Sequence, residues 1–96
     1  MRSLEESRAA LDAVDRELVR LFEQRMHIVQ EVAAYKQAHG LPVLDRSREG
    51  QVLDSRAAML TDERLKDSVR TLFVQIMALS RAEQERLLAT AEEDAQ

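Results

Sequence analysis

The chain has 96 residues, of which 14 are Lys or Arg and 18 are Asp or Glu, so its formal net charge is -4. This length allows a single domain, residues 1-96, and the acidic balance argues against a broad nucleic-acid-binding surface. The absence of cysteine excludes disulfides and thiolate metal sites. Two glycines, one proline and 3% aromatic residues, beside abundant Ala, Leu, Arg and Glu, predict an all-α fold.

The N-terminal segment, residues 1-6, carries charge where a secretory signal needs an apolar stretch. No run in the sequence approaches the roughly 18 apolar residues of a membrane span. We therefore expect a cytoplasmic protein that has no membrane partner.

The first predicted helix runs from about Leu4 to about His39, because one stripe repeats at alternating spacings of three and four residues. The stripe consists of Leu11, Val14, Leu18, Leu21, Arg25, Ile28, Val32, Tyr35 and His39. Gly40 followed by Pro42 predicts the end of this helix, since glycine relaxes a left-handed C-cap and proline cannot continue the hydrogen-bond ladder.

Two shorter helices are predicted after this stop. The second starts at Asp45, whose carboxylate can cap free amides, and ends near Leu60. Thr61 and Asp62 supply the next cap, after which an apolar stripe extends the third helix to about Leu88. We expect the acidic end, residues 92-94, to fray.

The length of the first helix predicts the assembly. A helix of about 36 residues is about 54 Å long, whereas a compact domain of this size has a radius of gyration of about 12 Å. The stripe remains apolar along most of that length, so a second copy of the chain is its natural cover. We expect an intertwined helical homodimer with three helices per chain, one long, one short and one intermediate; the alternative is an elongated monomeric hairpin with one wet face.

Two cations lie on the first helix at positions that suggest a site. Arg25 falls within the apolar stripe, where a buried guanidinium needs an anionic partner. Lys36 follows 11 residues later, close to three full turns, so both heads project from one face and a small dianion could sit between them. The ordinary alternatives are an Arg25 stem that packs while its head reaches water, and a solvated Lys36 near a helix C-terminus.

Further polar residues come from the other two helices. Ser80 and Gln84 are one turn apart on the third helix and continue an apolar face with uncharged donors. The segment 45-49 is a dense charge cluster at a helix start, for which capping and surface salt bridges are the ordinary explanation. The sequence contains no metal-binding cluster, no glycine-rich phosphate loop and no candidate catalytic triad, so we expect neither a metal nor a cofactor.

In combination these positions resemble the all-helical, AroQ-type chorismate mutases, best known as the mutase domain of bifunctional bacterial enzymes of phenylalanine and tyrosine synthesis. The resemblance covers nearly the whole chain. It rests on Arg8, the segment Leu11-Asp12-Ala13-Val14-Asp15, Arg25, Lys36 with Pro42-Val43 behind it, Asp45, Arg48, Glu49, Ser80 and Gln84.

The resemblance implies that the chain converts chorismate to prephenate and that eight polar residues line its site. These are Arg8, Arg25, Lys36, Asp45, Arg48, Glu49, Ser80 and Gln84. Because Arg8 and Lys36 are 28 residues apart on one helix, or about 42 Å, they cannot both touch one small molecule from the same chain. Arg8 is therefore expected to serve the partner's site in the dimer.

By the same resemblance, Arg8 and Arg25 clamp the two carboxylates of chorismate, with Ser80 as an additional donor. Lys36 and Gln84 donate to the ether oxygen, which gains negative charge as its bond to carbon breaks.

The remaining three residues are expected at the hydroxyl end of the substrate. Glu49 is expected to accept a hydrogen bond from the ring hydroxyl, with Asp45 bordering that end. Arg48 either orients Glu49 or contacts the ligand.

Two other interpretations of the sequence remain. An isochorismate-pyruvate lyase resembles these mutases in fold and in its basic pocket, but we expect it to depart from the pattern of Arg48 followed by Glu49. A non-enzymatic helical dimerisation module would use the basic residues in internal ion pairs. Members of the family are often fused to other enzymes, so the chain is either monofunctional or a domain cut from a fusion, and a partner enzyme of the shikimate pathway could modulate it.

Overall fold

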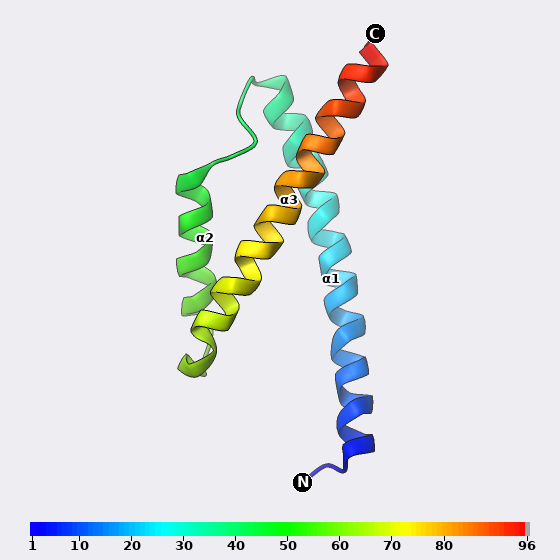
Figure 1. The fold of residues 1–96 in the computed structure, drawn as a ribbon, viewed down its shortest axis with the longest axis vertical. Helices are drawn as coiled ribbons and strands as arrows, with labels where there is room; N and C mark the ends of the chain where they lie inside the picture. The colour runs from blue at the N-terminus through cyan, green and yellow to red at the C-terminus, as the bar shows by residue number, and fades with distance from the viewer. Residues whose placement is uncertain (96) are drawn as a thin grey trace.

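The computed structural model describes residues 1-95 and contains three α-helices and one short 3-10 helix. The order is α1 (Leu4–Ala38), α2 (Arg46–Ala58), η1 (Glu63–Leu65) and α3 (Lys66–Ala95), as Figure 1 shows. No strand occurs among the described residues, which confirms the predicted all-α fold. Over the same residues, no helix combines the length and the apolar character needed to cross a membrane.

Both ends of α1 are set by local hydrogen bonds. Ser3 Oγ accepts from the backbone N–H of Glu6, and the Glu6 carboxylate accepts from the N–H of Ser3, which forms a capping box. At the other end Gly40 adopts a φ of 64°, and Leu41 N–H donates to Lys36 O at 2.8 Å. This left-handed turn confirms the predicted stop after residue 39.

The caps of the later elements follow the prediction, but the end of α3 does not. Asp45 accepts from Arg48 N–H at the start of α2, and Asp62 accepts from Arg64 N–H at the start of η1. The expectation that α3 ends near Leu88 was wrong, because the helix continues to Ala95. Neither Gly nor Pro occurs in this stretch to stop it, and its Ala, Leu and Glu residues favour the helix.

The three helices do not form a compact globule. In Figure 1, α3 runs diagonally between α2 and α1, and the N-terminal half of α1 projects beyond both. α3 packs on each of the other two helices, whereas the α1 and α2 backbones stay apart. The radius of gyration is 17.2 Å, against about 12 Å for a compact domain of this length. The buried apolar core is correspondingly small and consists of Val29, Ala33, Val52, Ala57 and Met77.

The projecting half of α1 carries an uncovered apolar face. Leu11, Val14, Leu18 and Leu21 of the predicted stripe are 48% to 60% exposed. A contiguous exposed face of large aliphatic residues is unusual for a monomeric protein.

The two glycines of the chain allow a matched test of the turn after α1. We expect Gly40→Ala to lower the free energy of unfolding by about 1 to 2 kcal/mol, because an L-residue at positive φ is strained. Gly50→Ala, in the middle of α2, should instead raise it by about 0.5 to 1 kcal/mol. An added Cβ has no neighbour within 4 Å at either position, so backbone conformation alone separates the two variants.

Urea denaturation of both variants at equal chain concentration measures this difference. Equal effects of the two substitutions would contradict the proposed role of the left-handed turn.

Candidate active site

A cavity of about 300 Å³ lies between α1, α2 and α3, within the volume range of small-molecule sites. Seven of the eight residues predicted for the site line it, and they come from α1, from α2 and its N-cap, and from α3. These seven are Arg25, Lys36, Asp45, Arg48, Glu49, Ser80 and Gln84. The eighth, Arg8, is exposed and lies 17 residues before Arg25 on α1, or about 25 Å along the helix, so a single chain does not bring it to the cavity.

Arg25 has a neutral partner where the sequence analysis expected an anionic one. Its Nη1 donates to Ser80 Oγ at 2.7 Å, and Ser80 Oγ in turn donates to Ile76 O at 2.8 Å. Within residues 1-95 no carboxylate forms a salt bridge with Arg25. Burial lowers the pKa of the Arg25 guanidinium, and the nearby charges of Arg56 and Arg48 lower that pKa further. No acid among the described residues forms a salt bridge that would compensate the positive charge of Arg25.

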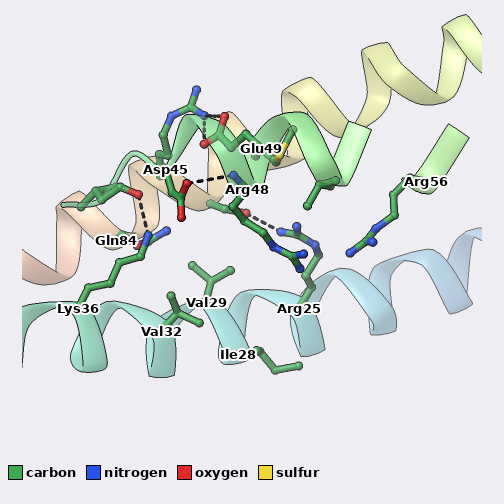
Figure 2. Close-up of a pocket in the computed structure, with 15 residues that line it drawn as sticks. Arg25, Ile28, Val29, Val32, Lys36, Asp45, Arg48, Glu49, Arg56 and Gln84 are labelled. Carbon is green, nitrogen blue, oxygen red and sulfur yellow. Dashed lines mark hydrogen bonds and ion pairs between the residues drawn. The ribbon is translucent and has the colours of Figure 1, made fainter. Parts of the chain in front are cut away.

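Two more guanidiniums share this end of the cavity. Figure 2 shows Arg48 and Arg56 reaching from α2 towards Arg25 on α1. Arg48 donates to Gln51 Oε1 at 2.9 Å, and Arg56 donates to Ser55 Oγ at 2.9 Å. Among the ion pairs of the described chain, none joins either residue to a carboxylate. This end of the cavity therefore holds three cations whose partners are all neutral.

The opposite end pairs an ammonium group with a buried amide. Lys36 Nζ donates to Val43 O at 2.7 Å, which leaves two of its three protons free. In Figure 2 the Lys36 head lies beside Gln84. Gln84 is 6% exposed, and its Oε1 is buried without a hydrogen-bond partner among the described residues. Such an unsatisfied buried group costs about 1 to 3 kcal/mol, so the site is prepared for a polar group supplied by a ligand.

The two acidic residues of the cavity already have partners. Asp45 caps α2 through the Arg48 backbone N–H at 3.0 Å. Glu49 forms an ion pair with Arg81 of α3, in which Arg81 Nη1 contacts both carboxylate oxygens, one of them at 2.6 Å. The Arg81 side chain is 31% exposed and the Glu49 side chain is 25% exposed, so the pair is half-buried. Arg81, and not Arg48, therefore orients Glu49, which corrects one of the two expected roles of Arg48.

Arg56 and Arg81 are cavity residues that the sequence analysis missed. Arg56 lies four residues after Val52 and seven after Glu49, a spacing that places it on the same face of α2, and this signal could have revealed it. Arg81 directly follows Ser80, but nothing in the sequence indicates that it pairs with Glu49, which is 32 residues away.

Apolar side chains complete the wall of the cavity. Val29, Val52 and Met77 are buried between the charged ends, while Ile28 and Val32 lie on the α1 side. They lower the local dielectric constant and so strengthen the interaction of a bound anion with the surrounding cations. Over residues 1-95, no group of His, Asp and Glu side chains is arranged to hold a metal ion.

A second hollow lies on the surface of a single helix and does not form a site within one chain. It has a volume of about 430 Å³ and follows the surface of α1, where Asp12, Asp15, Arg16 and Val19 line it. One helix cannot enclose a ligand, so this hollow belongs to the exposed surface of the projecting half of α1.

The fold and the cavity define a class of protein: an all-helical chain with one cavity, among its described residues, lined by cations and hydrogen-bond donors from three helices. Residues 7-85 match the family model of chorismate mutase type II, so the chain belongs to this family. Family membership supports chorismate mutase activity, an isomerase reaction of aromatic amino acid biosynthesis.

A curated relative agrees with the family assignment. The chain is 39% identical over 56 residues, or 58% of its length, to the T-protein of Haemophilus influenzae. The match spans only 15% of that protein.

The uncompensated charge of Arg25 has a measurable consequence for stability. We expect Arg25→Met to leave the free energy of unfolding unchanged or to raise it by up to about 1 kcal/mol, since it removes a partly desolvated charge that two other arginines repel. Water screens this half-exposed group, which keeps the effect small. Ser80 retains its bond to Ile76 O, so the substitution leaves no buried hydroxyl unpaired.

Urea unfolding of Arg25→Met beside Arg20→Met, an exposed arginine that pairs with Glu17, measures the effect. A loss of well over 1 kcal/mol for Arg25→Met would mean that Arg25 contributes to folding and not to ligand binding.

Proposed function

We propose that the cavity binds chorismate and converts it to prephenate without a metal or cofactor, as the mutase of a cytoplasmic aromatic amino acid pathway. The single observation that carries this proposal is the cluster of three guanidiniums at one end of the cavity, opposite Lys36 and Gln84, for which residues 1-95 supply no carboxylate partner. Chorismate carries two carboxylates, and its rearrangement is a pericyclic bond exchange that needs no nucleophile and no proton relay. Binding and electrostatics can therefore supply the catalysis.

Conformational selection is the first part of the proposed mechanism. Arg25 is held by Ser80 and presents its remaining donors to the cavity, where they can grip a carboxylate in bidentate fashion. Holding both carboxylates of chorismate keeps the side chain folded over the ring, in the compact conformer that reacts. This positioning lowers the entropic part of the barrier.

Stabilisation of developing charge is the second part. As the carbon–oxygen bond breaks, the ether oxygen gains negative charge, and the free protons of Lys36 can donate to it. The Gln84 carboxamide is buried beside Lys36, and its NH₂ group can add a second donor once the amide is oriented by a bound ligand. These donors are fixed before the reaction begins, so little reorganisation accompanies the step.

Glu49 completes the proposed contacts. Its carboxylate, anchored by Arg81, retains lone pairs that can accept a hydrogen bond from the ring hydroxyl of chorismate. Asp45 borders the same region from the N-cap of α2. This acceptor role supports the mutase over the isochorismate-pyruvate lyase.

The active form that we propose is a homodimer in which Arg8 completes the partner's site. Two observations support it: the apolar face on the projecting half of α1 has no cover in one chain, and Arg8 is exposed at that end, about 25 Å along α1 from Arg25. An antiparallel crossing of two α1 helices would bury the apolar face and carry Arg8 to the carboxylate end of the other cavity.

Assays with chorismate and, separately, isochorismate test the proposed activity. We expect the purified chain to form prephenate from chorismate and to release no pyruvate from isochorismate. Lys36→Ala should lower turnover by about 10² to 10³, the usual cost of losing one preorganised donor to a developing oxyanion. Lys66→Ala removes a lysine that pairs with Glu63 away from the cavity, and it should retain wild-type turnover.

Release of pyruvate from isochorismate would identify a lyase instead. Turnover of neither substrate would favour a non-enzymatic helical module, and equal rates for Lys36→Ala and wild type would exclude Lys36 from the chemistry.

A further inference from the structure

Arg56, like Arg25, is a half-buried arginine that forms no salt bridge among the described residues. Residues 1-95 contain four half-buried arginines, and two of them have carboxylate partners: Arg70 pairs with Asp54, and Arg81 pairs with Glu49. The two others, Arg25 and Arg56, face the same cavity. A partly desolvated guanidinium normally has an acid beside it, so a bound anion would stabilise both of these side chains.

The surroundings of Arg56 hold its head in place without neutralising it. Nη1 donates to Ser55 Oγ at 2.9 Å, and the guanidinium carbon lies 6.0 Å from the centre of the Phe73 ring. Both contacts are with uncharged groups, which leaves most of the guanidinium N–H donors available. The stem of the side chain is packed while its donors remain at the cavity wall.

Arg56 also faces Arg25: burial has the largest share in lowering the pKa of Arg25, and repulsion by the Arg56 charge lowers that pKa further. Two like charges held at one end of an apolar-walled cavity are unfavourable in the empty protein and become favourable only when an anion lies between them. The Glu49 carboxylate does not fill this role, because Arg81 holds it.

We propose that Arg56 is a further substrate-binding residue, which donates together with Arg25 to one carboxylate of the bound acid. This inference rests on the proposed function for the identity of that acid. It adds a guanidinium to the carboxylate end beside Arg25, in addition to the Arg8 expected from the partner.

Kinetics of Arg56→Met and Arg56→Lys test this role. Met keeps the packed stem against Phe73 and removes the charge, and Lys keeps the charge but not the fork of donors. We expect Arg56→Met to raise KM for chorismate by about tenfold with kcat changed less than about twofold, and Arg56→Lys to recover part of the loss. The control Arg64→Met removes an exposed charge outside the cavity and should leave KM unchanged.

Monomethyl esters of chorismate separate a binding role from a structural one. If Arg56 grips one carboxylate, wild type and Arg56→Met have equal KM values for the ester that blocks this carboxylate and differ for the other ester. An unchanged KM for chorismate, or the same loss with chorismate and both esters, would overturn the proposal.

The affinity of wild type and Arg56→Met for prephenate, measured by calorimetry, tests the role of Arg56 independently of turnover. If wild type turns over chorismate and Arg56→Met binds prephenate as tightly as wild type does, the proposed role of Arg56 is refuted while the proposed function stands. Absence of turnover in wild type refutes the proposed function, and the difference in prephenate affinity between wild type and Arg56→Met then decides the role of Arg56 by itself.

Discussion

The length of α1 is the constraint on which the rest of the account depends. A helix of 35 residues cannot be covered by α2 and α3 of the same chain, and its N-terminal half projects with a row of large aliphatic side chains in water. The C-terminal half, by contrast, packs against α3 and forms one wall of the cavity. One element thus supplies both the floor of the site and the surface that we propose for association. Changes that shorten or bend α1 should therefore affect assembly and binding together.

The neighbouring arginine charges of the cavity destabilise the empty protein, and a bound anion can offset this repulsion. Surface arginines such as Arg20 and Arg86 each have a carboxylate within one turn of helix, whereas the partners of Arg25 and Arg56 within residues 1-95 are neutral. Placing an acid beside these two would stabilise the empty protein and would block the anion site. Glu49, one of the two acids that line the cavity, is instead paired with Arg81, so the carboxylate end remains positive. Such unmet charge is expected of a site that acts by holding and polarising a dianion.

Much of the fold could be predicted from the sequence because it depends on helical periodicity, whereas most of the cavity residues were expected from the resemblance to chorismate mutases and not from spacing. The apolar stripe and Gly40 located α1, and the spacing of Arg25 and Lys36 placed both heads on one face. The end of α3 was misplaced because the apolar stripe fades before the helix does, and intrinsic helix propensity carries the backbone to Ala95. The pairing of Arg81 with Glu49 joins residues far apart in the chain, and no local pattern encodes such a contact.

The central claim is that each site is assembled from two copies of the chain, and mixing two inactive variants tests it most directly. Arg8→Ala and Lys36→Ala each spoil both sites of their own homodimer, but a dimer with one chain of each kind contains one intact site. After the two are unfolded and refolded together in equal amounts, half of the dimers should be mixed, so activity should return to about one quarter of the wild-type value. Refolding of either variant alone controls for recovery without exchange. If mixed dimers, isolated through two different affinity tags, remain as inactive as their parents, Arg8 does not serve the partner's site and the account is wrong.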